Sequence, residues 1–126
     1  MCILLVEDEP LIRRILAEEL AEAGFEVREA ETGEQAAALI AAAPTSFTVL
    51  VTDIHMPGSL DGIELARLLR AQRPDIPIIY TTGRPDTLDS TGHLGARNVL
   101  IAKPFAPSYL LAVVHRLLGA GGDRAR

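Results

Sequence analysis

Five short apolar runs, each followed by a segment with helical signals, constrain the fold of this chain more than any other feature. The runs cover residues 2–6, 25–29, 47–52, 77–81 and 98–102. Strands that alternate with helices of about 10–15 residues favour βαβ units, which have right-handed crossovers and place helices on both faces of a parallel sheet. Five such units match the flavodoxin-like strand order 2-1-3-4-5. We therefore predict a doubly wound (βα)5 fold of the α/β class.

The segments between these runs carry helix signals of unequal strength. Pro10 and Pro107 can each occupy a first helical turn, where a missing N–H is harmless. Sequences typical of a capping box begin at Thr32 and Asp61. The segment 84–96 has two leucines, glycine at the internal position 92 and many small polar residues. We therefore predict four regular helices and a short or frayed helix within 84–96.

The length of the chain indicates a single domain. It has 126 residues, of which 48% are hydrophobic, and this is enough to build a core on both faces of one sheet. The last helix carries apolar residues at helical spacing up to Leu118, and we expect Gly119 to end it. The prediction is one domain over 1–118 and a short polar tail over 119–126.

Charge and cysteine content exclude several classes of function. The net charge is −5, which argues against non-specific binding to nucleic acid or to anionic membranes. A single cysteine, Cys2, cannot form an internal disulfide or a cysteine metal cluster. No run approaches the ~20 apolar residues of a membrane helix, and the first strand begins without a signal peptide. We therefore expect a cytoplasmic protein.

Polar residues stand directly after four of the predicted strands. They are Glu7 and Asp8, Asp53, Thr82 and Gly83, and Lys103 and Pro104. The carboxyl ends of parallel strands meet at one edge of the sheet, and the switch point of the 2-1-3-4-5 order lies between the first and third strands. Glu7, Asp8 and Asp53 follow those two strands, so we expect their carboxylates to converge.

Converging carboxylates need a compensating partner. Two of them about 4 Å apart repel by about 4 kcal/mol at an effective dielectric constant of 20. Protonation or a hard cation relieves this repulsion, and Mg²⁺ fits because it binds one or two carboxylates while keeping waters and contacting phosphate oxygens. Lys103 is expected to pair with Asp53, and the bond before Pro104 is a candidate cis peptide. Thr82 can offer a hydroxyl to a phosphoryl oxygen, and Gly83 lets backbone approach closely.

Each of these residues also has an ordinary interpretation. An acid after a strand usually lies in a solvated turn, and a lone lysine is usually a surface residue. A threonine at a strand end often serves only to pack against its neighbours. The functional interpretation depends on all of them occurring together at the ends of neighbouring strands.

The same residues carry a resemblance to a known family. The motifs are ILLVEDE at 3–9, TDIHMPG at 52–58, TTG at 81–83 and AKPF at 102–105. In this order the chain resembles the receiver domain of two-component response regulators from Met1 to about Leu118. The resemblance implies that Asp53 is the phosphoacceptor. It also implies that Asp8 binds magnesium directly, Glu7 through water and His55 through its backbone carbonyl, and that Thr82 and Lys103 contact the phosphoryl oxygens.

The resemblance further implies a signalling function. Such a module takes a phosphoryl group from a sensor histidine kinase or a histidine phosphotransfer protein in a magnesium-dependent reaction, and it is no enzyme beyond its own phosphorylation and dephosphorylation. Its output face would comprise the helix within 84–96, the strand 98–102 and the helix from Pro107. The same face could support a dimer. We expect a stand-alone bacterial receiver, without nucleic-acid or membrane contacts.

The chain departs from the usual family pattern at several positions. Leu100 stands three residues before Lys103, where an aromatic switch residue is usual. The loop 58–62 is one residue longer than the commonest form, and Gly83 replaces a frequent alanine. His55 and Arg84 would flank the phosphoryl group. We hypothesise that they tune its lifetime by screening the attacking water; the alternative is that both are solvated loop side chains.

Three alternatives remain open from the sequence. The chain can be a receiver module of a hybrid kinase or phosphorelay. It can be a phosphatase with Asp53 as nucleophile, although such enzymes usually have a second acid where this chain has His55. A flavin carrier would need a phosphate cradle after the first strand, where Glu7, Asp8 and Glu9 instead repel phosphate.

Overall fold

One parallel sheet organises the protein, for which a computed structural model describes residues 1–84 and 97–122. The five strands lie in the order β2-β1-β3-β4-β5, which confirms the predicted flavodoxin-like α/β fold. Their bounds are β1 Cys2–Val6, β2 Glu26–Ala30, β3 Phe47–Asp53, β4 Ile78–Thr82 and β5 Asn98–Ala102. Strand β3 extends one residue further than predicted because Asp53 still pairs with Thr81 of β4.

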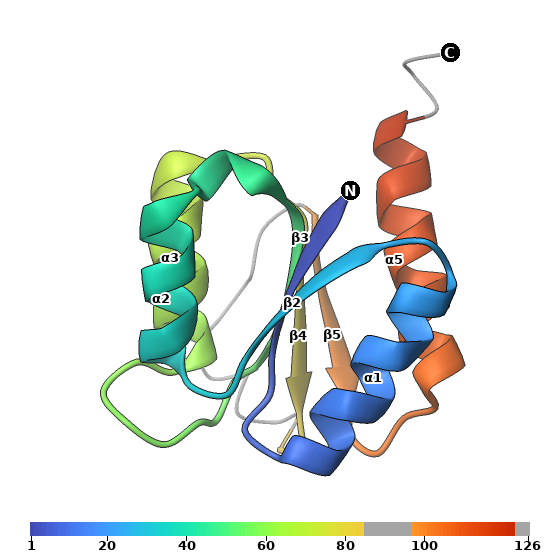
Figure 1. Cartoon of the computed structure of the whole chain (residues 1–126), viewed down its shortest axis with the longest axis horizontal. Helices are drawn as coiled ribbons and strands as arrows, with labels where there is room; N and C mark the ends of the chain where they lie inside the picture. The colour runs from blue at the N-terminus through green and yellow to red at the C-terminus, as the bar shows by residue number, and fades with distance from the viewer. Residues whose placement is uncertain (85–96, 123–126) are drawn as a thin grey trace.

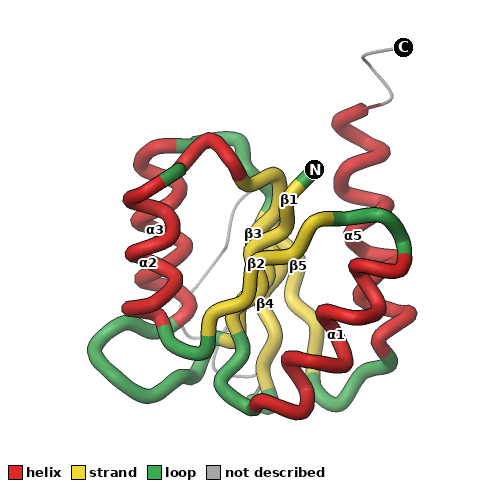
Figure 2. The backbone as a smooth tube through the Cα atoms, viewed as in Figure 1, coloured by secondary structure: helices red, strands yellow, loops and turns green. Residues whose placement is uncertain are grey.

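Helices cover both faces of the sheet. They are α1 Pro10–Glu22, α2 Gly33–Ala42, α3 Gly62–Gln72 and α5 Pro107–Gly122, with a short 3-10 helix, η1 Pro44–Ser46, before β3. Figure 1 shows α2 and α3 on one side of the sheet and α1 and α5 on the other. The tube view in Figure 2 shows the same three layers. The helix predicted within 84–96 falls on residues that lie almost wholly outside the described part of the chain.

The two hydrophobic cores follow from the alternation of side chains along the central strands. Leu4 and Val6 of β1 point into the core beneath α2 and α3, whereas Ile3 and Leu5 point into the core beneath α1 and α5. All four are almost completely buried, and each such side chain contributes about 1.5–3 kcal/mol of burial free energy. Burial on both faces explains why β1 and β3 read as continuous apolar runs.

The predicted helix caps at Thr32 and Asp61 are confirmed. The Thr32 hydroxyl accepts the N–H of Gln35 at 3.0 Å, and the Asp61 carboxylate accepts the N–H of Glu64 at 2.9 Å. The Gln35 side chain reaches back to the N–H of Glu31 at 2.8 Å, one residue before the cap. These caps place the starts of α2 and α3 beside the carboxyl edge of the sheet.

The predicted end of the last helix is wrong. Helix α5 continues past Gly119 to Gly122, so residues 119–122 belong to the helix. A glycine ends a helix where its backbone turns left-handed, as Gly24 does after α1 with φ +101°. Gly119 shows no such turn. Within residues 1–84 and 97–122, no helix is both long enough and apolar enough to cross a bilayer.

Candidate functional site

Three carboxylates meet at the carboxyl edge of the sheet, as predicted. Glu7 and Asp8 follow β1 directly, and Asp53 is the last residue of the neighbouring strand β3. One carboxylate oxygen from each of Glu7, Asp8 and Asp53 lies within 4.8 Å of the others. We refer to these three residues as the acid cluster. Its position follows from strand pairing, because β1 and β3 run side by side in parallel.

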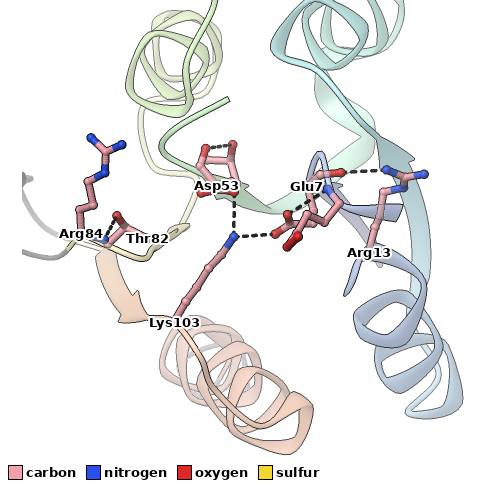
Figure 3. Close-up of polar contacts among 8 residues, drawn as sticks. Glu7, Arg13, Asp53, Thr82, Arg84 and Lys103 are labelled. Carbon is pink, nitrogen blue, oxygen red and sulfur yellow. Dashed lines mark hydrogen bonds and ion pairs between the residues drawn. The ribbon is translucent and has the colours of Figure 1, made fainter. Parts of the chain in front are cut away.

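Lys103 reaches into the acid cluster from the loop after β5. Its ammonium lies 2.8 Å from Asp53 Oδ2 and 3.1 Å from Glu7 Oε1, so the predicted pair with Asp53 is confirmed. Figure 3 shows the amine between the two carboxylates. The Lys103 backbone N–H is bonded to the Thr82 carbonyl at 2.8 Å, which ties this loop to the end of β4. The peptide bond between Lys103 and Pro104 is cis, as predicted.

Burial and charge set the electrostatics of the cluster. Glu7 is 2% exposed and Asp53 is 5% exposed, and this burial raises the pKa of both carboxyl groups, against the opposing effect of Lys103. Burial alone would lower the pKa of Lys103, but its pairing with Asp53 and Glu7 raises it overall. These shifts agree with one another, since a single ammonium pairs with Glu7 and Asp53 and cannot neutralise both carboxylates.

The donor set of the acid cluster fits a hard divalent cation. Three carboxylates face one ammonium, so two negative charges remain uncompensated when all groups are ionised. The donors are all oxygens, and they are close enough together to share one ion. Oxygen ligands of this kind suit Mg²⁺, which is held by one or two carboxylates and keeps several waters.

Thr82 and Gly83 lie at the end of β4, next to β3. Thr82 is fully buried, and its hydroxyl accepts the N–H of Arg84 at 2.9 Å. Among the described residues no hydrogen bond joins Thr82 to Asp53. A Cβ at Gly83 would meet no atom of the described residues within 4 Å, so packing against these residues does not require glycine there. The prediction that Gly83 allows the backbone to approach a phosphoryl group closely stays a prediction.

Within the described part of the chain, no hydrogen bond or ion pair made by the side chain of His55, Arg84 or Leu100 reaches the acid cluster. The Nε2 atom of His55 is buried and has no hydrogen-bond partner in residues 1–84 and 97–122. Arg84 is exposed, and its guanidinium makes no ion pair within the described parts of the chain. Leu100 is half-buried, pairs in register with Tyr80 and packs against the core beneath α2 and α3.

Two further residues support the cluster and were not identified from the sequence. The Arg13 guanidinium on α1 donates to the Glu7 backbone carbonyl at 2.9 Å and pairs with Glu29 at 3.3 Å (Figure 3). The Thr52 hydroxyl donates to the Asp53 carbonyl at 3.0 Å. The only sequence signal was the adjacent pair Arg13 and Arg14, which does not reveal which arginine turns toward the site.

Comparison with known proteins supports the family resemblance. The model of the response regulator receiver domain family matches residues 3–115. Response regulator MprA of Mycolicibacterium vanbaalenii is 37% identical over 117 residues, which cover 92% of this chain and 49% of that protein. The chain spans about half the length of the first relatives it matches.

Solved structures show the same fold along nearly the whole chain. A response regulator receiver protein from Sinorhizobium medicae superimposes with a TM-score of 0.87 at 28% identity, covering 95% of both chains. The chemotaxis protein CheY4 of Vibrio cholerae superimposes with a TM-score of 0.79 at 31% identity, covering 92% of this chain and 97% of that one.

Proposed function

Since this chain belongs to the response regulator receiver domain family, we propose that it is a phosphoacceptor module that takes a phosphoryl group from a histidine kinase onto Asp53. One observation carries the proposal. The buried Asp53 carboxylate is bonded to Lys103 at 2.8 Å and lies within 4.8 Å of the carboxylate oxygens of Glu7 and Asp8. A nucleophile, a counter-charge and a cation site therefore share one edge of the sheet.

The residues that would hold Mg²⁺ are Asp8 and Asp53 directly, Glu7 through water and His55 through its backbone carbonyl. When bound, the ion neutralises charge on the transferring phosphoryl group. Among the proposed ligands, Glu7 is further held by the N–H of Glu9 at 3.2 Å, and Arg13 fixes its carbonyl. The acids are thus oriented by the protein before any ion arrives.

Asp53 acts as an in-line nucleophile in this proposal. One of its carboxylate oxygens forms the bond to phosphorus while the bond from phosphorus to the donor histidine nitrogen breaks, and the electron pair returns to the imidazole. Lys103 stabilises the charge spread over the phosphoryl oxygens, so the protein contributes positioning and electrostatics. The Thr82 hydroxyl accepts the Arg84 N–H, which leaves its own hydrogen free to donate to a phosphoryl oxygen.

Phosphorylation would then change the output face. The product would carry about −1.5 to −2 charges and would be contacted by the Thr82 and Lys103 side chains. The backbones of these two residues are joined by the hydrogen bond from the Lys103 N–H to the Thr82 carbonyl. Movement of Thr82 would shift the segment after Arg84, together with β5 and α5. Because Leu100 replaces the usual aromatic residue, we propose that this shift proceeds without aromatic reorientation. The face is also the proposed site for a dimer.

A protein phosphodonor is favoured over a small substrate by the surface beside the site. A groove of about 460 Å³ adjoins Lys103 and is lined by apolar side chains of α1, of the loop after β5 and of the first residue of α5, namely Ile12, Ile15, Leu16, Pro104, Phe105 and Pro107. Such a surface suits contact with a protein. With His55 in place of a second acid, we propose that the chain catalyses only its own phosphorylation and dephosphorylation. We place this reaction in the cytoplasm, as a two-component or phosphorelay step.

The test is covalent labelling with a small phosphodonor, phosphoramidate, followed by intact mass spectrometry. We expect one phosphoryl group per chain in the presence of Mg²⁺, none in EDTA and none in Asp53→Asn. Labelling that survives Asp53→Asn would contradict the proposal. Multiple turnover of a phosphate ester such as p-nitrophenyl phosphate, lost in Asp53→Asn, would instead support a phosphatase.

A further inference from the structure

The loop between β3 and α3, residues 54–61, is closed at its base beside Asp53. The N–H of Ile54 is bonded to the Thr81 carbonyl at 2.9 Å, and the N–H of Gly62 is bonded to the Ile54 carbonyl at 2.9 Å. A side chain at Gly62 would overlap the Asp53 carbonyl. Both ends of the loop are therefore fixed next to the backbone of Asp53, the proposed phosphoacceptor.

The far side of this loop is held by one carboxylate on α2. Glu34 Oε2 accepts the backbone N–H of Ser59 at 2.7 Å and the Ser59 hydroxyl at 2.6 Å. The Ser59 hydroxyl and N–H lower the pKa of Glu34, so the group is ionised at neutral pH. Gly58 adopts φ +100° against the same carboxylate, and a Cβ at Gly33 would overlap Leu60. We refer to the Glu34–Ser59 contact as the clasp.

His55 lies between the base of the loop and the clasp. Ile54 is bonded to the sheet and Ser59 to α2, so the residues 55–58 span from one anchor to the other. The backbone carbonyl of His55 is the proposed cation ligand in this span. Without the clasp, this side of the loop would keep its packing against Gly33 but lose its hydrogen bonds to Glu34, and the carbonyl would sample more orientations.

We propose that Glu34 is a positioning residue for the cation site, acting through Ser59 on the loop that carries His55. The inference rests on the proposed function, because it assigns a role toward the ion that the acid cluster would hold. Glu34 touches neither the phosphoryl group nor the ion. Its effect is on the affinity for Mg²⁺ rather than on the chemistry at Asp53.

Glu34 could also raise the affinity for Mg²⁺ simply through its negative charge. The geometry of the clasp allows this effect to be separated from an effect of the hydrogen bonds to Ser59. Both hydrogen bonds end on a single oxygen of Glu34, so the amide oxygen of glutamine can accept both without carrying a charge. Glu31 is an exposed acid three residues earlier, and only its backbone N–H is bonded to α2 in the described structure. Glu31→Ala therefore removes the same charge and keeps the clasp.

The experiment titrates Mg²⁺ into the wild-type protein, Glu34→Ala, Glu34→Gln and Glu31→Ala, and follows backbone amide shifts by NMR, including that of His55. The dissociation constant should rise roughly three- to tenfold in Glu34→Ala, below the ~10–100-fold typical of groups bonded directly to a metal ligand. It should stay near the wild-type value in Glu34→Gln and Glu31→Ala. Urea denaturation in EDTA should show that Glu34→Ala is fully folded in the absence of denaturant.

Two results would overturn the inference. Glu34→Ala could bind Mg²⁺ as well as the wild type does, or Glu34→Gln and Glu31→Ala could weaken binding as much as Glu34→Ala, which would assign the effect to charge. A wild-type protein that binds no Mg²⁺ at all would instead remove the proposed cation site. The failure of the clasp and the failure of the proposed function are therefore distinguishable.

Discussion

The Lys103 ammonium lies 2.8 Å from Asp53 Oδ2, joining the loop after the edge strand β5 to the end of the central strand β3. Lys103 is the only lysine of the chain, and it also contacts Glu7 at 3.1 Å. It is therefore the sole ammonium side chain available to the acid cluster. Before phosphorylation this ammonium offsets part of the negative charge of the acid cluster, and during transfer the same ammonium is proposed to stabilise the phosphoryl group.

Replacing Lys103 with alanine should destabilise the cation-free protein. The variant leaves Glu7, Asp8 and Asp53 facing one another without an internal counter-charge. Breaking a fully buried ion pair costs about 3–5 kcal/mol, and the Lys103 side chain is 22% exposed. Allowing for screening by solvent, we expect a loss of about 2 kcal/mol in the free energy of unfolding. Urea denaturation in EDTA measures it.

Addition of Mg²⁺ should recover part of the stability lost in Lys103→Ala, since the ion supplies the missing positive charge. Arg116→Ala removes an exposed cation from α5 and serves as the control, with an expected change within about 0.5 kcal/mol. Equal losses in the two variants would show that the pairing of Lys103 with the acid cluster contributes nothing specific.

Replacing Asp53 with asparagine should stabilise the cation-free protein at neutral pH. Burial raises the pKa of Asp53, with Lys103 opposing the shift and Asp8 adding to it. Because the pKa is higher in the folded state, the stability that the carboxyl group contributes is present below its unfolded pKa of about 3.8 and is lost as the pH rises through the folded pKa. Asparagine does not titrate.

The advantage of Asp53→Asn in the free energy of unfolding should therefore be near zero at the acid end and should grow as the pH rises to neutrality. Urea denaturation in EDTA at a series of pH values measures this difference. Asp75→Asn changes an exposed acid that precedes β4 at the opposite edge of the sheet, and it should show no such growth. An Asp53→Asn advantage that shrinks as the pH rises would refute the sign assigned here.

The strand order and the acid cluster could be predicted because they depend on patterns within single segments. Residues 2–6 and 47–52 are apolar or β-branched throughout, which is typical of central parallel strands. Placing these two segments side by side brings Asp8 and Asp53 to one edge. The end of α5 could not be predicted in the same way, since Gly24 and Gly119 are the same residue type in different backbone conformations.

The contacts that support the site, made by Arg13 and by the clasp, could not be predicted from the sequence either. Arg13 and Arg14 are neighbours, and successive residues of a helix point about 100° apart. Only the packing of α1 on the sheet decides that Arg13 faces Glu7 while Arg14 pairs with Glu18 on the surface. The clasp joins residues 25 positions apart, and it depends on the path of a loop that has no periodic pattern.

Removing the Arg13 guanidinium should weaken cation binding without preventing folding. Arg13→Gln loses the bond to the Glu7 carbonyl, so the segment that carries Glu7 and Asp8 becomes less restrained. We expect the Mg²⁺ dissociation constant to rise roughly tenfold, since supporting groups of metal ligands typically contribute on this scale. The neighbouring Arg14→Gln removes the same charge from an exposed surface pair. A matching loss of affinity in both variants would assign the effect to net charge.

His55 should affect how long the phosphoryl group survives on Asp53. It follows Asp53 by two residues, and its buried Nε2 atom has no hydrogen-bond partner among the described residues. We hypothesise that the ring lies beside the acyl phosphate. Removing the ring in His55→Ala opens that space to water. Exclusion of water protects reactive intermediates from hydrolysis, and we expect the phosphoryl group to be lost roughly threefold faster or more.

Arg84→Ala is the companion variant, because Arg84 follows Thr82 by two residues and is exposed. If its guanidinium screens the attacking water, its removal should also shorten the lifetime, whereas a solvated side chain would leave it unchanged. Decay of the phosphorylated protein, followed by intact mass after the phosphodonor is removed, gives the rate for each variant. Tyr109→Ala, an exposed change on α5, controls for general surface effects. Unchanged decay in both His55→Ala and Arg84→Ala would show that neither side chain affects the lifetime of the phosphoryl group. The lifetime would then depend on Lys103, Thr82 and the bound cation.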